Sequence, residues 1–410
     1  MKKNIFFITT TFPSQVNLFF LDRITYFIEQ GYNVQVFASA GKKEQKLHED
    51  YLKFNLAELT HYYKPEKSGY FNSIIGLLKD LIGKTIETIN LLAKTSSKEY
   101  FEKFSLSNYF RIKTFSKTIT PDVIYVYNGA TANNMLFLKA LYPDSKFLAH
   151  FVGGDFSSRV RKNGVDYYSK LFKKADYLLA LSNYSSNVLS ALGCSENKII
   201  VNRAGVDTSI FRPSVIGKEK SDVVKFVSVS RIIEKKAHIN TIKAFNRISK
   251  SNLNFEYHIL GDGNEELIRK IKFEIELNPD LKERIYFHGF VTKNNMPKIM
   301  RDMDVFIMPS VTTMRWAEQE DTPLSVLEAQ AQGIPVISTY HAGIPEIVKI
   351  GKTGLLVPER NIKELEKAIL FFIENRVALE SYKVNCVNFI NKEFSNDKRL
   401  LEFEDFLQTC

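Results

Sequence analysis

Short apolar runs alternate with amphipathic stretches along almost the whole chain. Residues 4–9 form an apolar, strand-prone run, residues 19–30 have helical periodicity that stops at Gly31, and residues 33–38 again have strand character. Further strand-like runs follow at residues 123–127, 146–151, 177–182 and 198–202. This alternation predicts βαβ units, and hence a parallel sheet covered by helices.

A break comes at residues 208–222, which contain Pro213, Gly217 and several charges and therefore indicate a linker. The alternation then begins again. The expected strands are residues 225–230, 255–260, 284–288, 305–309 and 335–338, with a helix over 239–250. We predict an α/β protein of two Rossmann-like domains, residues 1–207 and 223–390, with the linker 208–222 between them and a helix in 391–410. Ligands of such sheets bind outside the carboxyl ends of the strands, so the predicted site is a cleft between facing domains.

Composition is that of a soluble globular protein, with 44% hydrophobic and 25% charged residues, and excludes disorder, collagen and coiled coil. Three distant cysteines, Cys194, Cys386 and Cys410, form neither a disulfide framework nor a metal-ligand spacing, which fits a reducing compartment. Charged residues interrupt the N-terminal apolar stretch, and no window offers about 20 uninterrupted apolar residues. Neither a signal peptide nor a membrane-spanning helix is therefore expected, and the predicted location is the cytoplasm.

The net charge of +10 lies entirely in residues 1–212, which hold 28 Lys and Arg against 18 Asp and Glu, while the remainder is neutral. Such asymmetry indicates an anionic partner for the first half, either nucleic acid or an anionic membrane face; the alternative is an ordinary solvated surface. Within residues 64–117, a helix-like run at 74–92 carries Lys79 and Lys84 and is followed by lysines interleaved with aromatics. This pattern favours an interfacial membrane contact, although a plain surface helix has the same signature.

A candidate anion site lies in residues 320–335, where the pattern predicts a loop, a helix and a strand. Thr322 suits an N-cap, Pro323 the first helical position and Gly333 the left-handed residue after the helix. The free backbone N–H groups and the positive dipole end would then lie beside Glu320. Glu328 follows about a turn and a half further, where it can reach a different hydroxyl.

A pair of cations follows the strand expected at residues 225–230. Arg231 comes at its carboxyl end and Lys236 five residues later. Together they can converge on a diphosphate, the first as a planar fork and the second as a point charge. Taken alone, such a pair is usually solvent-facing, and the functional interpretation depends on its conjunction with the Glu320 segment.

These two segments resemble the family 4 retaining glycosyltransferases of the GT-B fold, in particular the bacterial exopolysaccharide and glycolipid branch. The family's E-x₇-E pattern appears as Glu320 and Glu328 with Pro323 between them, and its G-R-L-x-x-x-K-G pattern as residues 230–237. Supporting segments are residues 198–207, 259–263, 287–289, 304–310 and 343–347. The match covers most of residues 170–360 and is weaker over 10–150.

The resemblance implies roles for these residues. Arg231 and Lys236 would neutralise the leaving diphosphate, Glu320 would contact the sugar, Glu328 the ribose, and residues 289–291 would border the base. The implied donor-binding set is Arg231, Lys236, Gly261, Gly289, Phe290, Val291, Glu320, Asp321, Thr322, Pro323, Leu324 and Glu328. The reaction would retain anomeric configuration without a metal or other cofactor, from a UDP- or GDP-linked sugar. In this fold the last helix crosses back to the first domain, and we expect the same here.

On the acceptor side the resemblance is incomplete. Where many relatives have H-F-H-G-x-D-x-S, this chain has Val152 in place of the second histidine, with His150 two residues earlier. Period-two alternation puts both on one side of the strand, so His150 could act in its place as a catalytic residue or could be a satisfied strand-end histidine. The expected acceptor-side residues are Phe12, Asn17, Gly153, Gly154 and Asp155, and the first two belong to a loop without glycine.

Three function classes remain open. The leading hypothesis is sugar transfer from a nucleotide diphosphate sugar to a lipid-linked or glycolipid acceptor, by an enzyme peripheral to the inner face of the cell membrane and without a nucleic-acid partner. Val152 leaves room for a non-catalytic donor-binding or scaffold subunit. A sugar-nucleotide epimerase shares the architecture but needs acid/base groups in the cleft. Asp302 and Asp304 mimic a D-x-D metal pattern, yet they lie at an expected helix end, and no metal site is predicted.

Overall fold

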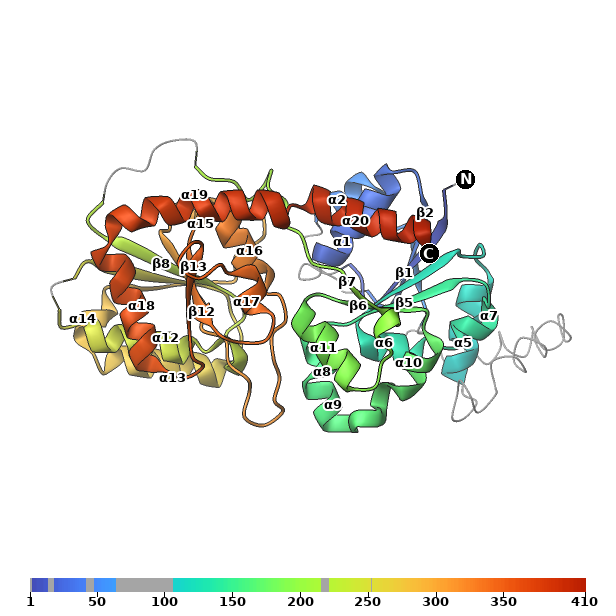
Figure 1. Ribbon diagram of the computed structural model, residues 1–410, viewed down its shortest axis with the longest axis horizontal. Coiled ribbons are helices and arrows are strands. Elements are labelled where there is room, and N and C mark those ends of the chain that lie inside the picture. The colour runs from blue at the N-terminus through green and yellow to red at the C-terminus, as the bar shows by residue number, and fades with distance from the viewer. Residues whose placement is uncertain (1, 14–17, 42–47, 64–105, 215–220, 252) are drawn as a thin grey trace, which may run out of the picture.

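The computed structural model of the protein describes residues 2–13, 18–41, 48–63, 106–214, 221–251 and 253–410. Two α/β domains lie side by side in Figure 1, each built on its own parallel sheet. This confirms the predicted fold class. The basic run predicted at residues 74–92 lies outside the described residues, as does Asn17.

The first domain holds a parallel sheet whose described strands have the order β3-β2-β1-β4-β5-β6-β7. Its strands are β1 (Asn4–Thr11), β2 (Asn33–Ala40), β3 (Thr60–Tyr62), β4 (Val123–Tyr127), β5 (Lys146–His150), β6 (Tyr177–Ala180) and β7 (Ile199–Val201). Its helices are α1 (Leu18–Glu29), α2 (Glu49–Lys53), α5 (Leu106–Ser116), α6 (Gly129–Asn134), α7 (Leu138–Leu141), α8 (Gly153–Phe156), α9 (Ser158–Asn163), η2 (Val165–Tyr168), α10 (Ser169–Lys174), α11 (Asn183–Ala191) and η3 (Glu196–Lys198).

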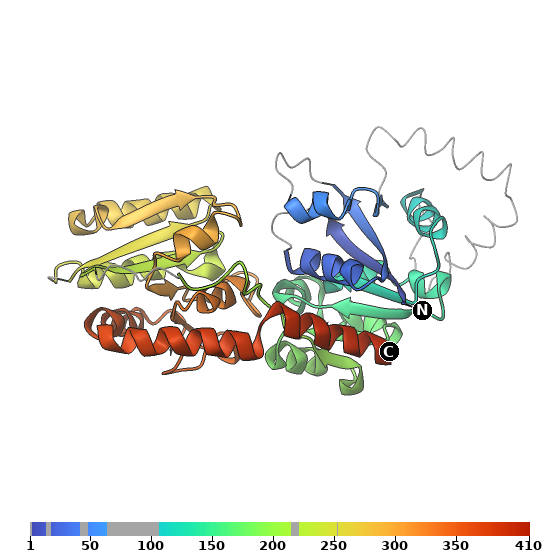
Figure 2. The ribbon, with the colours of Figure 1, turned by 90° about the horizontal axis from the view of Figure 1, so that it is seen from above.

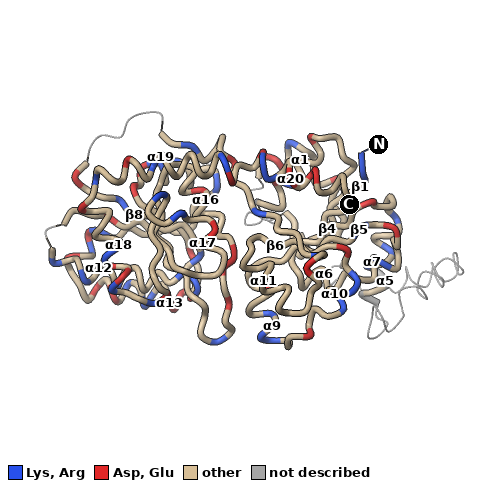
Figure 3. Tube along the Cα trace, in the orientation of Figure 1, with Lys and Arg blue, Asp and Glu red and all other residues tan. Residues whose placement is uncertain are grey.

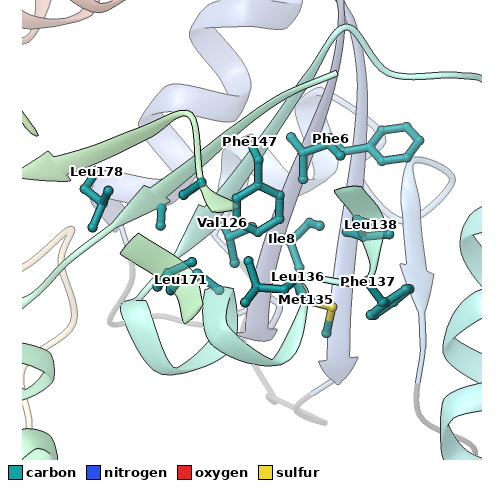
Figure 4. Packing of buried hydrophobic residues seen from close by; sticks show 14 of the residues in the cluster. Phe6, Ile8, Val126, Met135, Leu136, Phe137, Leu138, Phe147, Leu171 and Leu178 are labelled. Carbon is teal, nitrogen blue, oxygen red and sulfur yellow. The ribbon is translucent and has the colours of Figure 1, made fainter. Parts of the chain in front are cut away.

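Both faces of this sheet are buried, as the continuous apolar strands require. Along β1, Phe6 and Ile8 enter one core cluster while Ile5 and Phe7 enter the cluster on the opposite face. Figure 4 shows the first cluster, in which β1, β4 and β5 side chains meet those of the segment around α7. The strict period-two division explains why the strands were readable from the sequence.

In the second domain the described strands form a parallel sheet in the order β10-β9-β8-β11-β12-β13. These strands are β8 (Val224–Val229), β9 (Phe255–Leu260), β10 (Ile285–Gly289), β11 (Val305–Ile307), β12 (Val336–Thr339) and β13 (Gly354–Val357). Its helices are η4 (Glu234–Lys236), α12 (His238–Ile248), α13 (Glu265–Glu276), α14 (Pro279–Lys282), α15 (Met296–Met300), α16 (Leu324–Ala331), α17 (Ile344–Ile347), α18 (Ile362–Glu374) and α19 (Arg376–Glu393).

The last helix, α20 (Asn396–Thr409), leaves the second domain and packs on the first, as predicted (Figure 2). Phe403 and Leu407 enter the core cluster that also contains β1 side chains. Glu404 accepts hydrogen bonds from the hydroxyls of Tyr26 at 2.8 Å and Tyr32 at 2.9 Å. The chain therefore crosses between the domains twice, once in each direction.

Segments that follow the strands of one sheet contact segments that follow the strands of the other. Residue Gly153, after β5, packs against the backbone of residues 319–321, and Ser182, after β6, bonds to Asp321. The carboxyl ends of both sheets thus face each other, which is the arrangement that the predicted cleft requires. Within the described part of the chain, no helix is long and apolar enough to cross a membrane.

Candidate active site

Close packing of two loops fixes the start of the Arg231 segment. The N–H of Ile232 donates to Asp262 O at 2.9 Å, and Ile232 O accepts from Asn264 N at 2.9 Å. A Cβ on Gly261 would lie 1.9 Å from Ser230 O, so only glycine permits this approach. Gly261, predicted as a donor contact, therefore lies against the neighbouring loop and positions the segment that carries Arg231.

Three cations gather where this segment meets the loop before α16; we call Arg231, Lys235 and Lys236 the cation cluster. Lys236 Nζ lies 3.0 Å from Glu320 Oε2, and Lys235 Nζ lies 3.0 Å from Glu320 Oε1 and 2.9 Å from Glu318 Oε1. Arg231 is exposed and makes no ion pair with any residue that the structure describes. Lys235 could not be predicted from the sequence, because two adjacent lysines offer no spacing that says which of them pairs with Glu320.

Opposing effects act on the charges in this cluster. The Glu320 side chain is only 11% exposed. Burial would raise its pKa, but the ammonium groups of Lys236 and Lys235 outweigh burial and hold the pKa at about 2. For Lys236, burial lowers the pKa, and the Glu320 carboxylate only partly opposes this. The site is therefore a cluster of charged groups with little exposure to water, and its cations could bind an anion.

Helix α16 begins one residue later than predicted. Pro323 has extended backbone angles, φ −70° and ψ 115°, and is the N-cap rather than the first helical residue. The predicted Thr322 cap is wrong because the Thr322 hydroxyl instead donates to Leu181 O of the first domain at 3.4 Å. Gly333 has φ +76° after the helix, as predicted. The first turn of α16, starting at Leu324, still opens beside Glu320.

His341 holds the backbone of Glu320. The Glu320 N–H donates to His341 Nε2 at 2.9 Å, so this ring nitrogen carries no proton. The proton is then on Nδ1, which donates to Glu359 Oε1 at 2.6 Å. Both the main chain and the side chain of Glu320 are thus fixed before any ligand binds, as an electrostatic site requires.

Glu328 lies within α16, close to Asp22 of the first domain. Burial raises the pKa of this carboxyl to about 7, while Lys293 opposes the shift and Asp22 of the first domain adds to it. Lys293 Nζ lies 4.0 Å from Asp22 Oδ1, so an ion pair between domains borders this position. Glu328 and Glu320 are held apart on one helix and its leading loop, which suits contacts to different parts of one ligand.

The loop predicted to border the base presents one aromatic ring to solvent. Gly289 has φ +65°, and the following Phe290 is 62% exposed. Val291 is half-buried and packs against the core behind it. Phe290 is therefore available for stacking, whereas Val291 anchors the loop.

Asp321 joins the two domains across the cleft. Its Oδ1 accepts a hydrogen bond from the Ser182 hydroxyl at the start of α11, and burial raises its pKa to about 6. A Cβ on Gly343 would lie 2.6 Å from Asp321 O, so the contact leaves no room for a side chain there. The Asp321 side chain thus takes part in the interface between the domains, through its contact with Ser182.

A second contact between domains caps helix α11. The Glu346 carboxylate accepts from Asn183 N at 3.0 Å and Tyr184 N at 2.9 Å, and Arg203 Nη2 lies 3.2 Å from it. A carboxylate is stabilised at the positive end of a helix, and these bonds are charge-assisted. Together with the Asp321 contact, they hold the domains in a closed arrangement.

His150 lies buried at the end of β5. Arg23 Nη1 donates to the Tyr125 hydroxyl oxygen at 3.3 Å, which leaves the hydroxyl proton to donate to His150 Nδ1 at 2.6 Å. His150 Nε2 then carries the proton, and it has no partner among the described residues. Burial, followed by the Arg23 charge, lowers the pKa of His150 well below its usual value, so the ring is neutral. The Phe19 ring lies edge-on to His150, with the ring centroids 5.4 Å apart.

Two residues predicted as acceptor contacts, Asp155 and Phe12, are buried in the structure. Asp155 is buried and its carboxylate accepts from the N–H groups of Gly129 at 2.8 Å, Ala130 at 3.3 Å and Val152 at 3.1 Å. It therefore joins the loops after β4 and β5 and is not open to a ligand. Phe12 is also buried, in the core cluster of α1, because its aromatic ring finds apolar neighbours there.

The neighbouring glycines have different surroundings. A Cβ on Gly153 would lie 2.6 Å from Gln319 O, so this residue allows the domains to approach. Gly154 has only the Ser158 hydroxyl nearby, at 3.7 Å. Within α8, Gly154 O accepts a hydrogen bond from the Ser158 hydroxyl at 3.3 Å.

As for metals, the described residues contain no group of three or more His, Cys, Asp or Glu side chains placed to hold an ion. Asp304, from the D-x-D pattern, accepts a hydrogen bond from Lys225 N at 3.0 Å and so fixes the starts of β11 and β8. The positive charge near Glu320 comes from the cation cluster.

The sequence of the chain is similar to the sequences of known glycosyltransferases. Residues 213–388 match the family described as "Glycosyl transferases group 1". The chain is 31% identical over 374 residues to WcaL of Escherichia coli K12, a glycosyltransferase assigned to colanic acid biosynthesis, with 89% of each chain covered. It is also 29% identical over 240 residues to the UDP-Gal:alpha-D-GlcNAc-diphosphoundecaprenol alpha-1,3-galactosyltransferase of Escherichia coli, covering 56% of this chain and 59% of that protein.

Among solved structures, Anabaena Alr3699/HepE in complex with UDP-glucose superposes with a TM-score of 0.72 over 100% of both chains. At 16% identity, this is a likeness of fold alone. Lys236 and Glu320, from the two sequence patterns, are paired in the folded chain, and the identity to WcaL extends over 89% of its length. The protein therefore belongs to the group 1 glycosyltransferases and has their GT-B fold.

Proposed function

We propose that the protein transfers a sugar from a UDP- or GDP-linked donor to a lipid-linked or glycolipid acceptor, with retention of configuration and without a metal. The reaction would serve cell-surface polysaccharide or glycolipid synthesis at the cytoplasmic face of the cell membrane. The observation that carries this proposal is the cation cluster at the opening of α16, in which Lys235 and Lys236 are held on Glu320 and the Arg231 charge acts on Lys236. Each part of the cluster matches a property of a nucleotide diphosphate sugar.

Charge is the first such property. The cation cluster supplies three positive charges, and Glu318 and Glu320 supply two negative ones, so a small positive excess faces the cleft. A diphosphate diester is an anion, and the departing nucleoside diphosphate gains one more negative charge as the glycosidic bond breaks. Attraction to fixed cations thus increases toward the transition state, which is the requirement for catalysis rather than mere binding.

The division of roles follows from the geometry. Arg231, exposed and unpaired among the described residues, is free to hold phosphate oxygens with its planar fork. Lys236, whose side chain is 11% exposed and paired with Glu320, would complement the charge that develops on the leaving group. Glu320, fixed by His341 and both lysines, would orient a sugar hydroxyl, and Glu328 would accept hydrogen bonds from the ribose. Phe290 would stack on the base.

Retention and metal independence are parts of the proposal that rest on the family pattern. The side chains support the second part, because Arg and Lys stand where divalent ions neutralise diphosphates in other sites. The acceptor class rests on two facts. The net charge of +10 is confined to residues 1–212, and one relative acts on an acceptor with a diphosphoundecaprenol group. An anionic membrane surface would attract such a basic half.

The test is donor turnover by an Arg231→Ala variant. A panel of nucleotide sugars is first screened by thermal shift, since a ligand that binds only the folded state raises the melting temperature. With the best donor, Arg231→Ala is expected to lose on the order of 10²-fold in turnover. Arg269→Ala, which removes an exposed arginine from α13 of the same domain, is the matched control. Equal turnover by both variants would overturn the proposal.

A further inference from the structure

Residues 311–319 form a long loop between β11 and α16, which we call the rim loop. Its base is firmly held: Thr312 N donates to Glu359 Oε2 at 2.8 Å, and Met314 N donates to Glu234 Oε1 at 2.8 Å. Thr313 closes the loop on itself, since its N–H donates to Glu318 O at 3.0 Å and its hydroxyl accepts from Glu318 N at 2.9 Å. The rim loop is therefore a fixed projection.

Its tip carries large apolar side chains that do not enter the core. Met314 is 79% exposed and Trp316 is 37% exposed. The next residue, Ala317, has φ +48°, a left-handed conformation that costs an alanine about 1–2 kcal/mol. Rigidity, backbone strain and exposed apolar surface occurring together are features of binding elements rather than of simple connections.

Cations from both domains lie over the Trp316 ring. Lys162 Nζ, from α9 of the first domain, is 4.6 Å from the ring centroid, and the Arg315 guanidinium is 5.0 Å away. Arg161 and Arg159, also on α9, are exposed beside them. In Figure 3 the basic tip of the rim loop reaches down beside α9, where the two domains come together. Cations of both domains thus contact the Trp316 ring, which remains 37% exposed.

The rim loop connects directly to the proposed site of transfer. Glu318 and Glu320 share the Lys235 ammonium, at 2.9 and 3.0 Å. The neighbouring Gln319 N–H donates to the Ser157 hydroxyl of the first domain at 3.2 Å, and its side chain accepts from the Tyr184 hydroxyl at 3.0 Å. Trp316 therefore belongs to the same segment as Glu320, four residues before it, and this segment contacts the first domain between them.

We propose that Trp316, Lys162 and Arg315 form an acceptor subsite that binds a sugar ring next to an anionic group. The apolar C–H face of a sugar packs on the indole, and the two cations bind the adjacent charge. The anion would come either from the diphosphate of a lipid-linked sugar or from the carboxylate of an acidic sugar. This inference rests on the proposed function, because it names the acceptor chemistry of the same cleft.

Intrinsic fluorescence reports this site without any substitution, since Trp316 is the one tryptophan in the sequence. The wild-type protein is titrated with N-acetylglucosaminyl farnesyl diphosphate, with an oligosaccharide ending in glucuronic acid, and with a neutral oligosaccharide of equal length. We expect a saturable change in fluorescence with one of the two anionic probes, and at least tenfold weaker binding of the neutral oligosaccharide. The anionic probe that binds identifies the source of the charge. No change with either anionic probe, or equal binding of the neutral one, would overturn the inference.

Kinetics of variants separate the subsite from the donor site. Trp316→Ala is expected to raise the acceptor KM roughly tenfold, as for truncation of an aromatic anchor, with a smaller change in kcat. Trp316→Phe keeps a ring and should restore most of the affinity, and Lys162→Met should raise the KM for the anionic acceptor alone. An unchanged acceptor KM in Trp316→Ala contradicts the subsite, whereas absence of donor turnover in the wild type contradicts the proposed function instead.

Discussion

Replacing Lys236 by methionine separates the electrostatic role of this residue from its role in folding. Lys236 Nζ lies 3.0 Å from Glu320 Oε2, and methionine has a similar length but no charge. Glu320 keeps its second partner, Lys235, at 3.0 Å. Burial lowers the pKa of Lys236, so the charged form is held there at a cost that methionine does not carry. Since Lys235 still compensates Glu320, we expect a loss of stability well below the about 3–5 kcal/mol that a fully unpaired buried charge costs.

The effect on catalysis should be much larger. When the glycosidic bond breaks, one unit of negative charge appears on the diphosphate. At a separation of about 4 Å and an effective dielectric constant of about 20, an ammonium group stabilises that charge by roughly 4 kcal/mol. Since about 1.4 kcal/mol corresponds to a factor of ten, kcat should fall by on the order of 10²–10³.

The assay is release of nucleoside diphosphate under saturating donor, together with a urea unfolding curve for each protein. Lys270→Met is the control, because Lys270 makes an exposed ion pair with Glu266 at 2.6 Å on α13 of the same domain. The control should match the wild type in both measurements. A folded Lys236→Met protein whose kcat stays within threefold of the wild type would refute the assignment of Lys236 to the leaving group.

Three further predictions follow from individual contacts. Because burial raises the pKa of Glu328 to about 7, its carboxylate is ionised only above that pH; donor KM should rise by up to about tenfold per pH unit below 7, and Glu328→Gln should show a flat profile between pH 5.5 and 8. Ala237 has φ +52°, so Ala237→Gly should stabilise the protein by about 0.5–1 kcal/mol in urea unfolding, and destabilisation would contradict the strain argument. Glu346→Gln weakens the charge-assisted contacts to α11, so small-angle scattering should report a larger radius of gyration, and an unchanged radius would show that other contacts alone hold the domains closed.

Much of the proposed donor site could be predicted from the sequence because each of its two segments is contiguous in the chain. The segments around Arg231 and Glu320 each follow a strand, and parallel strands bring their carboxyl ends to one edge. Helix periodicity and Gly333 located α16 to within one residue at its start. The return of the last helix could be expected from the resemblance, and Phe403 and Leu407 show how it is anchored.

What could not be predicted depends on contacts between distant segments. Thr322 looks like a cap until the Leu181 carbonyl of the other domain is placed beside it. Asp155 looks like a ligand contact until three backbone N–H groups from two loops converge on it. Lys235 and His341 act through partners 85 and 21 residues away from them respectively, all meeting at Glu320. No local pattern distinguishes such residues from solvent-facing ones.

The central claim is that fixed side chains, rather than a metal, stabilise the departing diphosphate in a retaining transfer. The direct measurement is an NMR time course of the transfer reaction, with the donor chosen by thermal shift and excess chelator present throughout. The account predicts an unchanged rate in chelator and a first product with the anomeric configuration of the donor. Loss of the rate in chelator that added Mg²⁺ or Mn²⁺ restores, or a first product of inverted configuration, would contradict it.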